Sequence, residues 1–449
     1  MVFGKVLIAN RGEIALRIAR TCKELGIRTV AVYSTPDRDS ATVRMADEAV
    51  HIGPPPAKDS YLNAAAILQA ALSTGAEAIH PGYGFLSEDP DFADACEASG
   101  LVLVGPPASV LARLGSKVSA RAVMSAAGLP LLPGSLGPLG PQEARELADR
   151  IGYPVIIKSS AGGGGRGMRV VHDPATFGDD FRRTCAAART LFGDDRVYVE
   201  KYLERARHVE VQVVCDSRGG AAHLGTRDCT VQRRHQKLVE EAPAPCLPGD
   251  LAERMGQAAV HGALTAGYVG VGTFEFLVGR GGDFHFMEVN CRIQVEHPVT
   301  EAVTGIDLVR EQLAIAAGRP LALDQDRLTL RGVGLECRIN AEDPGAGFAP
   351  TPGVLAEFVP AGGPFVRVDT HAYTGYEVPP NYDSLLAKLV VWAPDRGAAI
   401  ARMRRALGEF RVAGPRIRTT IPFLADVLEH PRFVSATHDT GLADLIGGA

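Results

Sequence analysis

The sequence lacks most of the features that mark a secreted, membrane-bound or zinc-binding protein. Its eight cysteines include no C-x-x-C pair, which argues against a disulfide framework or a zinc site and predicts reduced, mostly structural thiols. No apolar run reaches the roughly 20 residues that span a bilayer, and the start "MVFGKVLIANRGE" turns polar too early for a secretory signal. We therefore expect a soluble cytoplasmic protein without membrane association.

The charge shows no strong bias toward either sign. The chain has 47 Lys and Arg residues against 52 Asp and Glu, a formal net charge of -5, and the two signs are mixed along the sequence. A basic stripe typical of nucleic-acid binding is missing, so we expect small molecules or proteins as ligands. The turn "IANRGEIAL" has one glycine in place of G-x-G-x-x-G, which removes the main support for a dinucleotide-dependent oxidoreductase.

What the sequence does contain is a regular alternation of strands and helices near its start. In residues 5–110, the apolar runs "KVLIA", "RTVAVYS", "EAIHPG" and "LVLVG" alternate with helical patterns such as "GEIALRIARTCKELG". This β-α-β rhythm predicts an open parallel α/β sheet. With 449 residues, 46% of them hydrophobic, the chain is long enough for about three domains.

The rest of the chain predicts a small insert and a large antiparallel sheet. The stretch "LPLLPGSLGPLGPQ" is typical of a linker, and a compact insert with one helix near Phe181–Ala188 extends to Leu203. From Arg207 onward the strand patterns are mostly two-periodic, which predicts a large antiparallel sheet with flanking helices. These patterns are "HVEVQVV", "GTFEFLV", "DFHFMEVN", "GLECRIN" and "LLAKLVVW".

A run of glycines in the insert is flanked by positive charges. The segment "IIKSSAGGGGRGMRVV" places Lys158 before the run and Arg166 after it. Bare backbone turns N–H groups toward anions, so the charges favour a phosphate-binding lid that is displaced without ATP. The spacing is not that of a P-loop, and a plain flexible linker remains the alternative. The glycines are Gly162, Gly163, Gly164 and Gly165.

Two glutamates are predicted to face each other in a hairpin. If Gly281-Gly282 is a two-residue turn, residue 280 pairs with 283 and Glu275 lies opposite Glu288. Facing carboxylates repel by about 4 kcal/mol at ~4 Å in an effective dielectric of about 20, so a cation should lie between them. Oxygen ligands favour Mg²⁺ or Mn²⁺, and an exposed edge with scattered acids is the alternative.

Further charged residues lie close to this hairpin in sequence. Arg292 and Glu296 bring a fixed cation and a possible general base, although a surface salt bridge would look the same. The segment "TRDCTVQRRHQKLVEEAPAP" adds a basic cluster suited to phosphate or a carboxylated intermediate, with a solvated basic turn as the alternative. The cluster consists of Arg233, Arg234, His235 and Lys237.

Taken together, these segments closely resemble biotin carboxylase, a family of the ATP-grasp superfamily, over essentially the whole chain. The matching segments are "IANRGEIALRI", "HPGYGFLSE", "GSKVSAR", "IIKSSAGGGGRGMRVV", "EKYLE", "RDCTVQRRHQKLVEEAPAP", "GTFEFL", "RIQVEHPVTE" and "ECRINAEDP". The resemblance implies a mixed α/β ATP-grasp fold. The implied parts are an N-terminal α/β domain (1–115), a linker helix and lid (116–203), a core with the metal site (204–330) and a C-terminal domain (331–449).

The resemblance also implies an activity: ATP-dependent carboxylation of biotin by bicarbonate through carboxyphosphate, with Mg²⁺ or Mn²⁺. By similarity Glu296 deprotonates bicarbonate and Arg338 stabilises the biotin enolate. The implied ATP contacts are Lys117, Lys158, the four glycines, Glu200, Lys201, Leu203, His208, Gln232, His235 and Leu277. The implied metal ligands are Glu275, Glu288 and Asn290. The implied bicarbonate and biotin contacts are Lys237, Arg292, Gln294, Val295, Arg338 and Tyr83.

The same resemblance implies partners and leaves alternatives open. No "AMKM"-like biotin acceptor occurs, so biotin should arrive on a biotin carboxyl carrier protein or domain, with a carboxyltransferase downstream and a homodimer as the expected assembly. Two positions depart from the usual pattern, Cys291 and Asn381, and neither removes a catalytic group. Another ATP-grasp carboxylate ligase and a non-catalytic nucleotide-binding subunit are the competing interpretations.

Overall fold

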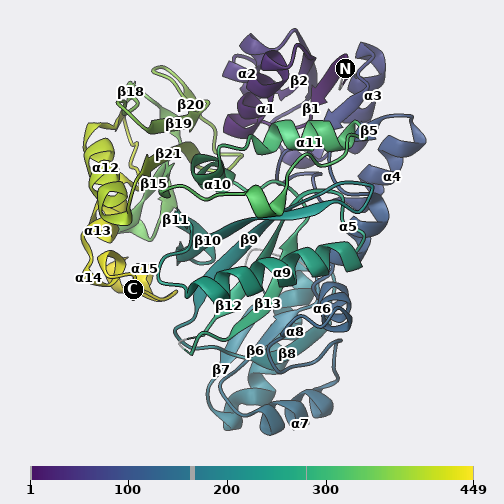
Figure 1. Ribbon diagram of the computed structural model, residues 1–449, viewed down its shortest axis with the longest axis vertical. Helices are drawn as coiled ribbons and strands as arrows, with labels where there is room; N and C mark the ends of the chain where they lie inside the picture. Colours follow the sequence, from purple (N-terminus) through teal and green to yellow (C-terminus); the bar gives the residue numbers. More distant parts are fainter. Residues whose placement is uncertain (1–2, 162–166, 280, 448–449) are drawn as a thin grey trace.

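The computed structural model describes residues 3–161, 167–279 and 281–447 (Figure 1). Its N-terminal part is a five-stranded parallel sheet in the order β3-β2-β1-β4-β5, which confirms the predicted open α/β sheet. The strands are β1 (Lys5–Ile8), β2 (Arg28–Ser34), β3 (Glu48–Gly53), β4 (Ala78–His80) and β5 (Val102–Leu103). The helices are α1 (Gly12–Glu24), α2 (Ala41–Met45), α3 (Ala64–Thr74), α4 (Pro90–Ala98) and α5 (Ala108–Gly115). Strand β3 was not foreseen because it is half exposed and has no apolar run.

The insert forms a small antiparallel sheet at the lower end of the molecule in Figure 1. Its strands are β6 (Val155–Ser159), β7 (Met168–Val171) and β8 (Val197–Lys201), in the order β7-β6-β8. Its helices are α7 (Pro141–Ile151) and α8 (Phe177–Phe192), and α6 (Lys117–Ala126) precedes it. The four glycines of the predicted lid lie outside the described residues, so their movement over a nucleotide stays a prediction.

The centre of the molecule is the expected large antiparallel sheet, with eight strands in the order β13-β12-β9-β10-β11-β14-β21-β19. The strands are β9 (Arg207–Cys215), β10 (Ala221–Arg233), β11 (Gln236–Ala242), β12 (Gly270–Val278), β13 (Phe284–Asn290), β14 (Val333–Asn340), β19 (Val366–Thr370) and β21 (Leu385–Ala393). Helix α9 (Gly249–Thr265) packs along β9 and β10, as both ribbon views show. Helices α10 (His297–Thr304) and α11 (Leu308–Ala316) follow β13.

The hairpin of β12 and β13 pairs the two predicted glutamates, but its turn differs from the prediction. Glu275 lies opposite Glu288. The predicted two-residue turn at Gly281-Gly282 is wrong. The N–H of Gly279 donates to the carbonyl of Asp283 at 2.8 Å, so residue 279, not residue 280, pairs with residue 283. A bulge next to Glu275 then shifts the ladder by one residue and brings the glutamates into register.

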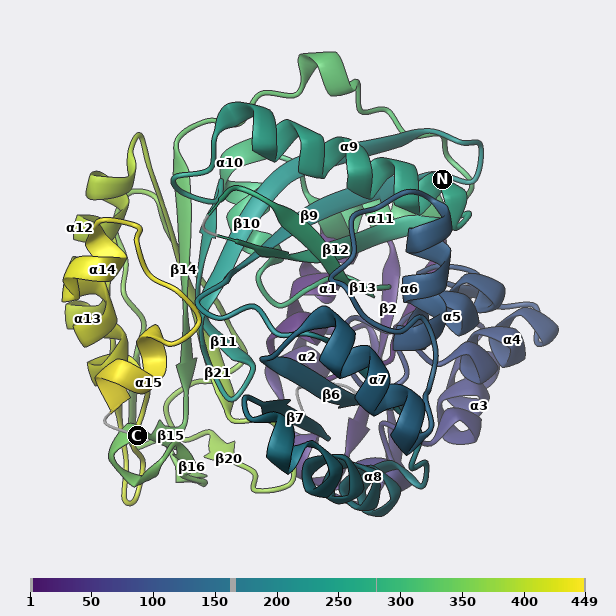
Figure 2. The same cartoon turned by 90° about the horizontal axis from the view of Figure 1, so that it is seen from below.

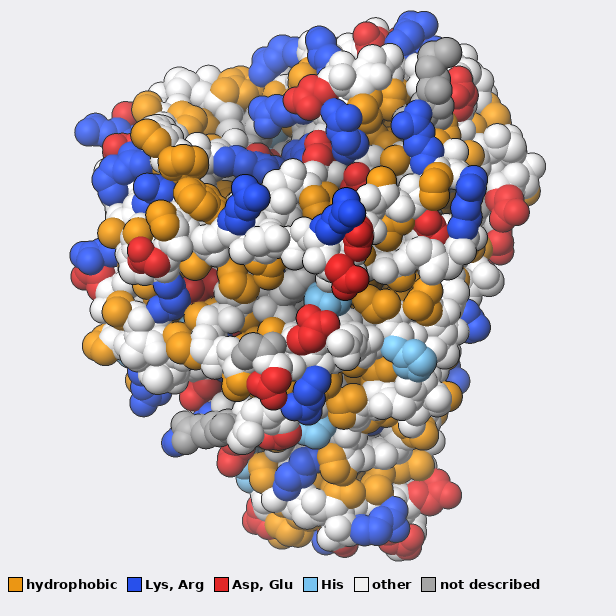
Figure 3. Space-filling model, in the orientation of Figure 1, with side chains coloured by type: hydrophobic (Ala, Val, Ile, Leu, Met, Phe, Trp, Pro, Cys, Tyr) orange, Lys and Arg blue, Asp and Glu red, His pale blue; other side chains and the backbone are white. Residues whose placement is uncertain are grey.

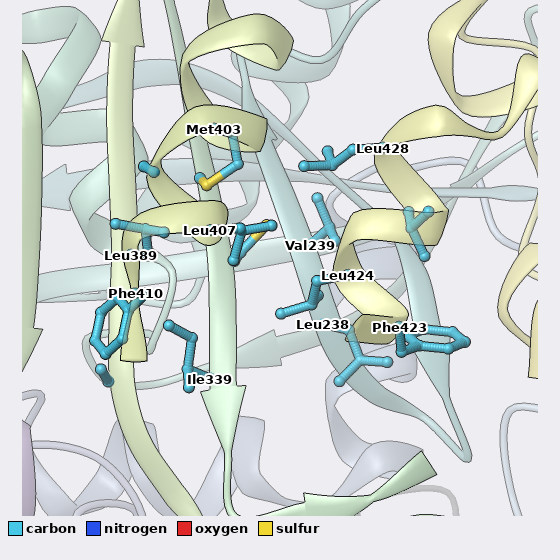
Figure 4. Packing of buried hydrophobic residues seen from close by; sticks show 14 of the residues in the cluster. Leu238, Val239, Ile339, Leu389, Met403, Leu407, Phe410, Phe423, Leu424 and Leu428 are labelled. Atoms are coloured by element: carbon cyan, nitrogen blue, oxygen red, sulfur yellow. The ribbon is translucent and has the colours of Figure 1, made fainter. Parts of the chain in front are cut away.

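The C-terminal helices cover one face of the sheet's far end (Figures 2 and 4). Val239, Ile339 and Leu389 from neighbouring strands pack against α12 and α13 in one buried apolar cluster. The helices here are α12 (Arg396–Glu409), α13 (Ile421–Glu429), α14 (Pro431–Val434) and α15 (Leu442–Gly447). The short strands are β15 (Glu342–Asp343), β16 (Ala349–Pro350), β17 (Gly353–Val354), β18 (Glu357–Val359), β20 (Glu377–Val378) and β22 (Arg411–Ala413).

The molecular surface and the helices carry two further observations. On the face drawn in Figure 3, basic and acidic side chains are intermingled. Within the described ranges, no helix combines the length and the apolarity that a membrane crossing requires. All eight cysteines lie in described segments and are free thiols.

Candidate active site

One face of the eight-stranded sheet is lined with charged side chains. Successive side chains of a strand point to opposite faces. Because Ile339 and Leu389 point into the apolar cluster, their neighbours Arg338 and Lys388 point to the other face. Arg338 and Lys388 also lie opposite each other in β14 and β21. The same alternation collects the charged residues of β9, β12 and β13. A bulge in the β10–β11 ladder between Val239 and Lys237 brings Lys237 to this face, so most of the predicted site residues lie together.

Lys237 is the cationic centre of this face. Its Nζ lies 2.7 Å from Glu210 Oε2, 2.8 Å from Glu275 Oε1 and 2.6 Å from Glu296 Oε1. Burial alone would lower the pKa of Lys237, but the three carboxylates outweigh burial and hold that pKa well above its ordinary value. The ammonium group therefore stays charged and ties together three strands and the start of α10.

Glu296 lies between two cations. Its Oε1 faces Lys237, and its Oε2 accepts a hydrogen bond from Nη2 of Arg338 at 2.8 Å. On its other side, Arg338 donates from Nε to Oε1 of Glu240 at 2.6 Å. Burial raises the pKa of Glu296, but the charges of Lys237, Arg338 and Arg227 outweigh burial and hold that pKa below its ordinary value. The carboxyl group is therefore ionised.

Cationic side chains lie beside the paired glutamates, and the divalent cation expected between the two carboxylates stays a prediction. Lys117 Nζ is 2.8 Å from Glu288 Oε2, and His208 Nε2 is 2.9 Å from Glu275 Oε2. The charge of Glu288 raises the pKa of Lys117. Asn290 lies on the same face and donates to Glu275 Oε1 at 2.8 Å. Lysine and histidine thus offset the repulsion between the two carboxylates.

The same oxygen atoms form a donor set that suits a hard divalent cation. Glu275 and Glu288 supply carboxylate oxygens, which are the ligands that Mg²⁺ and Mn²⁺ prefer. Asn290 lies on the same face, where its Nδ2 faces Glu275 and its Oδ1 accepts from Arg292. His208, Glu210 and Glu275 also place one ligand atom each within 4.8 Å of one another. The ammonium group of Lys117 shows where additional positive charge is favourable.

Arg292 is held by hydrogen bonds along its whole guanidinium edge. Nε donates to Glu88 Oε2 at 2.8 Å, Nη1 to Gln294 Oε1 at 2.8 Å and Nη2 to Asn290 Oδ1 at 3.0 Å. The N–H of the buried Cys291 donates to the second oxygen of Glu88 at 2.8 Å. A cation that is fixed in this way can present its charge to an anion without reorganisation.

Several of the predicted ATP contacts cluster around the insert. Lys158 forms an ion pair with the buried Glu200, whose other oxygen accepts from Nη1 of Arg121 at 2.7 Å. Gln232 lies 3.4 Å from the ring of His208. Lys158, Glu200 and His208 are buried, so a nucleotide that reaches them is shielded from water.

The other predicted ATP contacts differ in their surroundings, and Leu277 of β12 lies opposite His208 of β9. The ammonium of Lys201 donates to the carbonyls of Gly152 and Tyr153, both at 3.0 Å, so its charge is used within the insert. His235 is exposed in the turn between β10 and β11, with φ at 65°. Leu203 and Leu277 are partly exposed.

A cavity of about 450 Å³ opens beside Glu296 and Arg338. Its lining includes Tyr83, Lys237, Val295 and Arg338 from the predicted set, together with Asn381. The remaining lining residues are Asn10, Arg11, Gly12, Glu13, Ala57, Gly84, Phe85, Gln236, Asn340, His371, Tyr382, Asp383 and Leu385. The cavity is therefore formed jointly by the N-terminal sheet, the core and the C-terminal strands.

The sequence did not reveal the buried partners of the site residues. Arg227 is fully buried and donates from Nε to Glu210 Oε1 at 2.5 Å. Arg121 donates to Glu200 in the same way, whereas Glu88 accepts from Arg292 and Glu13 accepts from Tyr83. The alternation of "AHLGTRDCTVQ" could have indicated a strand with Arg227 on its inner face, but the basic residues after it suggested a turn.

Comparisons with known proteins agree with this geometry. Residues 2–111 match the family described as "Biotin carboxylase, N-terminal domain", residues 116–324 match "Carbamoyl-phosphate synthase L chain, ATP binding domain", and residues 336–444 match "Biotin carboxylase C-terminal domain". The chain is 53% identical over 441 residues to "Biotin carboxylase" of Nostoc sp., covering 98% of each protein.

Two solved structures are similar over nearly the whole chain. A complex of biotin carboxylase from Campylobacter jejuni with β,γ-ATP has a TM-score of 0.96 and 45% identity, covering 99% of both chains. The biotin carboxylase domain dimer of Hydrogenobacter thermophilus 2-oxoglutarate carboxylase, in complex with MgADP, ADP and bicarbonate, has a TM-score of 0.95 and 45% identity, covering 99% of this chain and 98% of that one. With three matching family models and relatives of this identity, the chain belongs to the biotin carboxylase family.

Proposed function

We propose that this chain is an ATP-dependent biotin carboxylase, which carboxylates carrier-bound biotin with bicarbonate through carboxyphosphate. This is the first half-reaction of a biotin-dependent acyl-CoA carboxylase. The observation that carries the proposal is the ionised Glu296, which lies between Lys237 and Arg338 beside the cavity. This arrangement suits a reaction in which one anion must lose a proton and another must be stabilised.

Glu296 is proposed to act as the base toward bicarbonate. Lys237 and Arg292 would bind the bicarbonate oxygens, with Gln294 and the backbone of Val295 completing the pocket. A carboxylate held by two cations is a weak base, because both cations favour its ionised form. Bicarbonate that competes for these cations would weaken their hold on Glu296, and its pKa would rise when a proton has to be accepted.

The insert and the core are proposed to bind ATP between them. Lys117, Lys158 and His208 would contact the phosphates together with the four glycines of the lid. The adenine side would be formed by Glu200, Lys201 and Leu203, and the remaining contacts by Gln232, His235 and Leu277. The C. jejuni relative, which was solved with a nucleotide, supports this assignment.

Glu275, Glu288 and Asn290 are proposed to hold Mg²⁺ or Mn²⁺ with the nucleotide. The bound cation would neutralise phosphate charge. Lys117 and Lys237, which neutralise the carboxylates here, could then turn toward the phosphates and bicarbonate. The H. thermophilus relative was solved with MgADP and bicarbonate, which supports binding of a magnesium nucleotide and of bicarbonate.

Arg338 is proposed to stabilise the enolate that forms when biotin loses its ureido proton. Its Nε and Nη2 atoms are fixed by Glu240 and Glu296, so the guanidinium group is oriented before biotin arrives. Tyr83 lines the same cavity and would contact the bicyclic ring. A fixed donor of this kind is worth about 2.7 to 4 kcal/mol to a developing oxyanion.

The partners follow from the proposed reaction. Biotin would arrive on a biotin carboxyl carrier protein or domain, and a carboxyltransferase would use the product. A homodimer is also proposed, supported by the dimeric H. thermophilus relative and by Phe365, which is 61% exposed beside Trp392. We propose a cytoplasmic location, consistent with eight free thiols, and the four-part division at residues 115, 203 and 330.

The proposal is tested by separating the two half-reactions. Glu296→Gln should suppress both bicarbonate-dependent ATP cleavage and carboxybiotin formation, because no base remains. Arg338→Ala should lower carboxybiotin formation by about 10² to 10³ and leave much more of the ATP cleavage, because Arg338 is proposed to stabilise the biotin enolate and Lys237 still holds Glu296. ADP release and carboxybiotin yield are measured side by side, with a melting curve for each variant.

The controls distinguish this activity from its competitors. Wild-type protein that shows no bicarbonate-dependent ADP release with free biotin would refute the proposal, and release stimulated by an amine instead would indicate another ATP-grasp ligase. Equal loss of both products in a folded Arg338→Ala protein would refute the separate role of Arg338 alone.

A further inference from the structure

A fully buried lysine outside the predicted site connects three segments of the cavity wall. Lys388 lies in β21, opposite Arg338 and on the same face of the sheet, and is 0% exposed. Its Nζ donates to the carbonyl of Val295 at 2.9 Å and forms an ion pair with Glu13 Oε2 at 3.0 Å. The carboxylate of Asp369 is farther away, at 3.9 Å.

Glu13 extends this connection to a cavity side chain. Its Oε1 accepts a hydrogen bond from the hydroxyl of Tyr83. Glu13 is 3% exposed and lies at the start of α1, while Tyr83 lies in the loop after β4. Lys388 therefore holds the Val295 backbone directly and the Tyr83 hydroxyl through Glu13, and all three of these partners line the same cavity.

Stability alone is a poor reason for this arrangement. A buried ion pair gains little net free energy over apolar residues of the same size, because the desolvation of both charges offsets their attraction. What the pair does provide is fixed geometry, because a buried ammonium group costs a great deal of free energy unless its partners stay in place. Lys388 is so placed that losing its geometry would move Tyr83 and Val295 together.

We propose that Lys388 is a positioning residue for biotin, fixing the Tyr83 hydroxyl through Glu13 and the Val295 carbonyl directly. The inference rests on the proposed function, since it needs a cavity that binds biotin. Lys388 touches no reacting atom, and its partners come from helix α1, the loop before α10 and strand β19. Lys388, in the C-terminal part of the chain, thereby positions cavity residues of the N-terminal part and of the core.

The test is a double-mutant cycle with biotin kinetics as the readout. Lys388→Met, close in volume and uncharged, and Tyr83→Phe should each raise the KM for biotin by roughly five- to tenfold, the effect of about one hydrogen bond. The double variant should resemble either single variant, because both changes break one connected unit. The KM for ATP should change less than twofold.

A matched control separates positioning from general destabilisation. Arg396, which is partly exposed, forms an ion pair with the buried Glu241 at 2.7 Å, remote from the cavity lining. Arg396→Met should lower the melting temperature without raising the KM for biotin, and its effects should add to those of Tyr83→Phe. If Lys388→Met does not fold, Glu13→Gln takes its place, since the amide keeps an acceptor for Tyr83 but loses the charge that pairs with Lys388.

The outcomes distinguish the inference from the function beneath it. Non-additive effects of Lys388→Met and Tyr83→Phe on the KM for biotin support positioning, and additive effects overturn it. An unchanged KM for biotin in folded Lys388→Met, or in Glu13→Gln if that variant is needed, also overturns it. Wild-type protein that does not carboxylate biotin at all refutes the proposed function before any variant is compared.

Discussion

At the scale of single residues, the buried pair of Glu240 and Glu336 shows how the site limits its negative charge. The two glutamates lie directly opposite each other in β11 and β14, and both are 0% exposed. Glu240 uses one oxygen to hold Arg338, and its other oxygen and both oxygens of Glu336 have no hydrogen-bond partner among the described residues. Two such carboxylates cannot both be ionised without a large cost, so the pair holds a proton.

This pair should give the protein a measurable pH dependence of stability. Burial and the charge of Glu240 raise the pKa of Glu336, against the opposing effects of Lys388 and Arg338, and Glu296 raises it further. Above pH 4.5, the ordinary pKa of a glutamate, the unfolded chain releases the proton of Glu336 while the folded protein keeps it. The stability of the fold therefore falls as pH rises above 4.5. Glu336→Gln removes the ionisable group, so the melting temperature of the variant relative to wild type should increase between pH 5 and pH 8.

The measurement is a set of melting curves across this pH range. Glu241→Gln is the comparison: burial raises the pKa of Glu241 as well, but its ion pair with Arg396 opposes this, so the increase with pH should be smaller than for Glu336→Gln. A difference between Glu336→Gln and wild type that stays constant with pH would show that Glu336 is ionised throughout and would contradict the shared proton.

Sequence motifs revealed the residues proposed to touch ligands but few of the residues that hold them. Arg292 and Glu296 stand in one short segment, and the pairing of Glu275 with Glu288 followed from strand alternation. Arg121 in α6 and Lys388 in β21 carry no such signal, because their carboxylate partners are far away in sequence and a single charged residue in a helix or an apolar strand resembles a surface residue. Only the tertiary fold brings each charge to its partner.

At the scale of elements, strand β8 is held in place by a glycine in the segment before α7. Gly134 forms an isolated bridge with Glu200, and a Cβ atom at this position would lie 2.7 Å from the carbonyl oxygen of Val199 and 2.8 Å from Glu200 Cα. Because these are backbone atoms of β8, a side chain cannot be accommodated by a rotamer change. The strand would have to move, and the Glu200 carboxylate with it.

We predict that Gly134→Ala weakens ATP binding through this displacement. Overpacking of this kind costs about 1 to 3 kcal/mol, and the contacts of Glu200 with Lys158 and Arg121 would be strained. The KM for ATP should rise several-fold while the KM for biotin stays the same. In the control Gly137→Ala, the new methyl group meets nothing within 4 Å, and both constants should be unchanged. Equal KM values for ATP in the two variants would contradict the prediction.

The predicted elements were most accurate where alternation is strong. Strands β9, β12 and β13 have inward apolar residues at every second position and were found. The predicted turn of the β12–β13 hairpin was wrong, because two adjacent glycines favour a two-residue turn and no sequence pattern indicates the bulge beside Glu275. Strand β10 was missed because charged residues such as Arg227 and Asp228 stand within it and the basic residues that follow suggested a turn.

At the scale of the whole molecule, the active face is assembled from all parts of the chain. Glu13 and Tyr83 come from the N-terminal part, Glu200 from the insert, Glu296 from the core and Arg338 from the C-terminal strands. The sequence indicated the parallel and antiparallel sheets separately. It could not show that β11 pairs with β14, which joins the core and C-terminal strands into one sheet, because strand partners far apart in sequence are not encoded locally.

The C-terminal end of the chain returns to this sheet and is attached there by one buried histidine. His438 Nε2 lies 3.3 Å from Asp228 Oδ1 in β10, and Asp228 also accepts from Nη2 of Arg207 at 2.7 Å. The N–H of Thr440 donates to the carbonyl of Ala206 at 3.2 Å. The segment that leads to α15 is therefore connected to the sheet by a charge-assisted contact and a backbone hydrogen bond, while Leu442 and Ala443 of α15 are buried in the apolar cluster.

We predict that His438→Ala releases this segment without changing the chemistry. Burial raises the pKa of Asp228, but Arg207 and His438 outweigh burial and hold that pKa below its ordinary value of 3.8, so the stability they provide is present above pH 3.8 and is lost as pH falls below it. At pH 7 the variant should lose roughly 1 to 3 kcal/mol, because a buried carboxylate loses a hydrogen-bond partner. Hydrogen exchange should accelerate in residues 435–447, while the KM for biotin stays constant because Asp228 and His438 lie outside the cavity lining.

His261→Ala changes an exposed histidine on α9. It is the control and should change neither exchange nor stability. Unchanged protection of residues 435–447 in a destabilised His438→Ala protein would show that other contacts hold the C-terminal end in place.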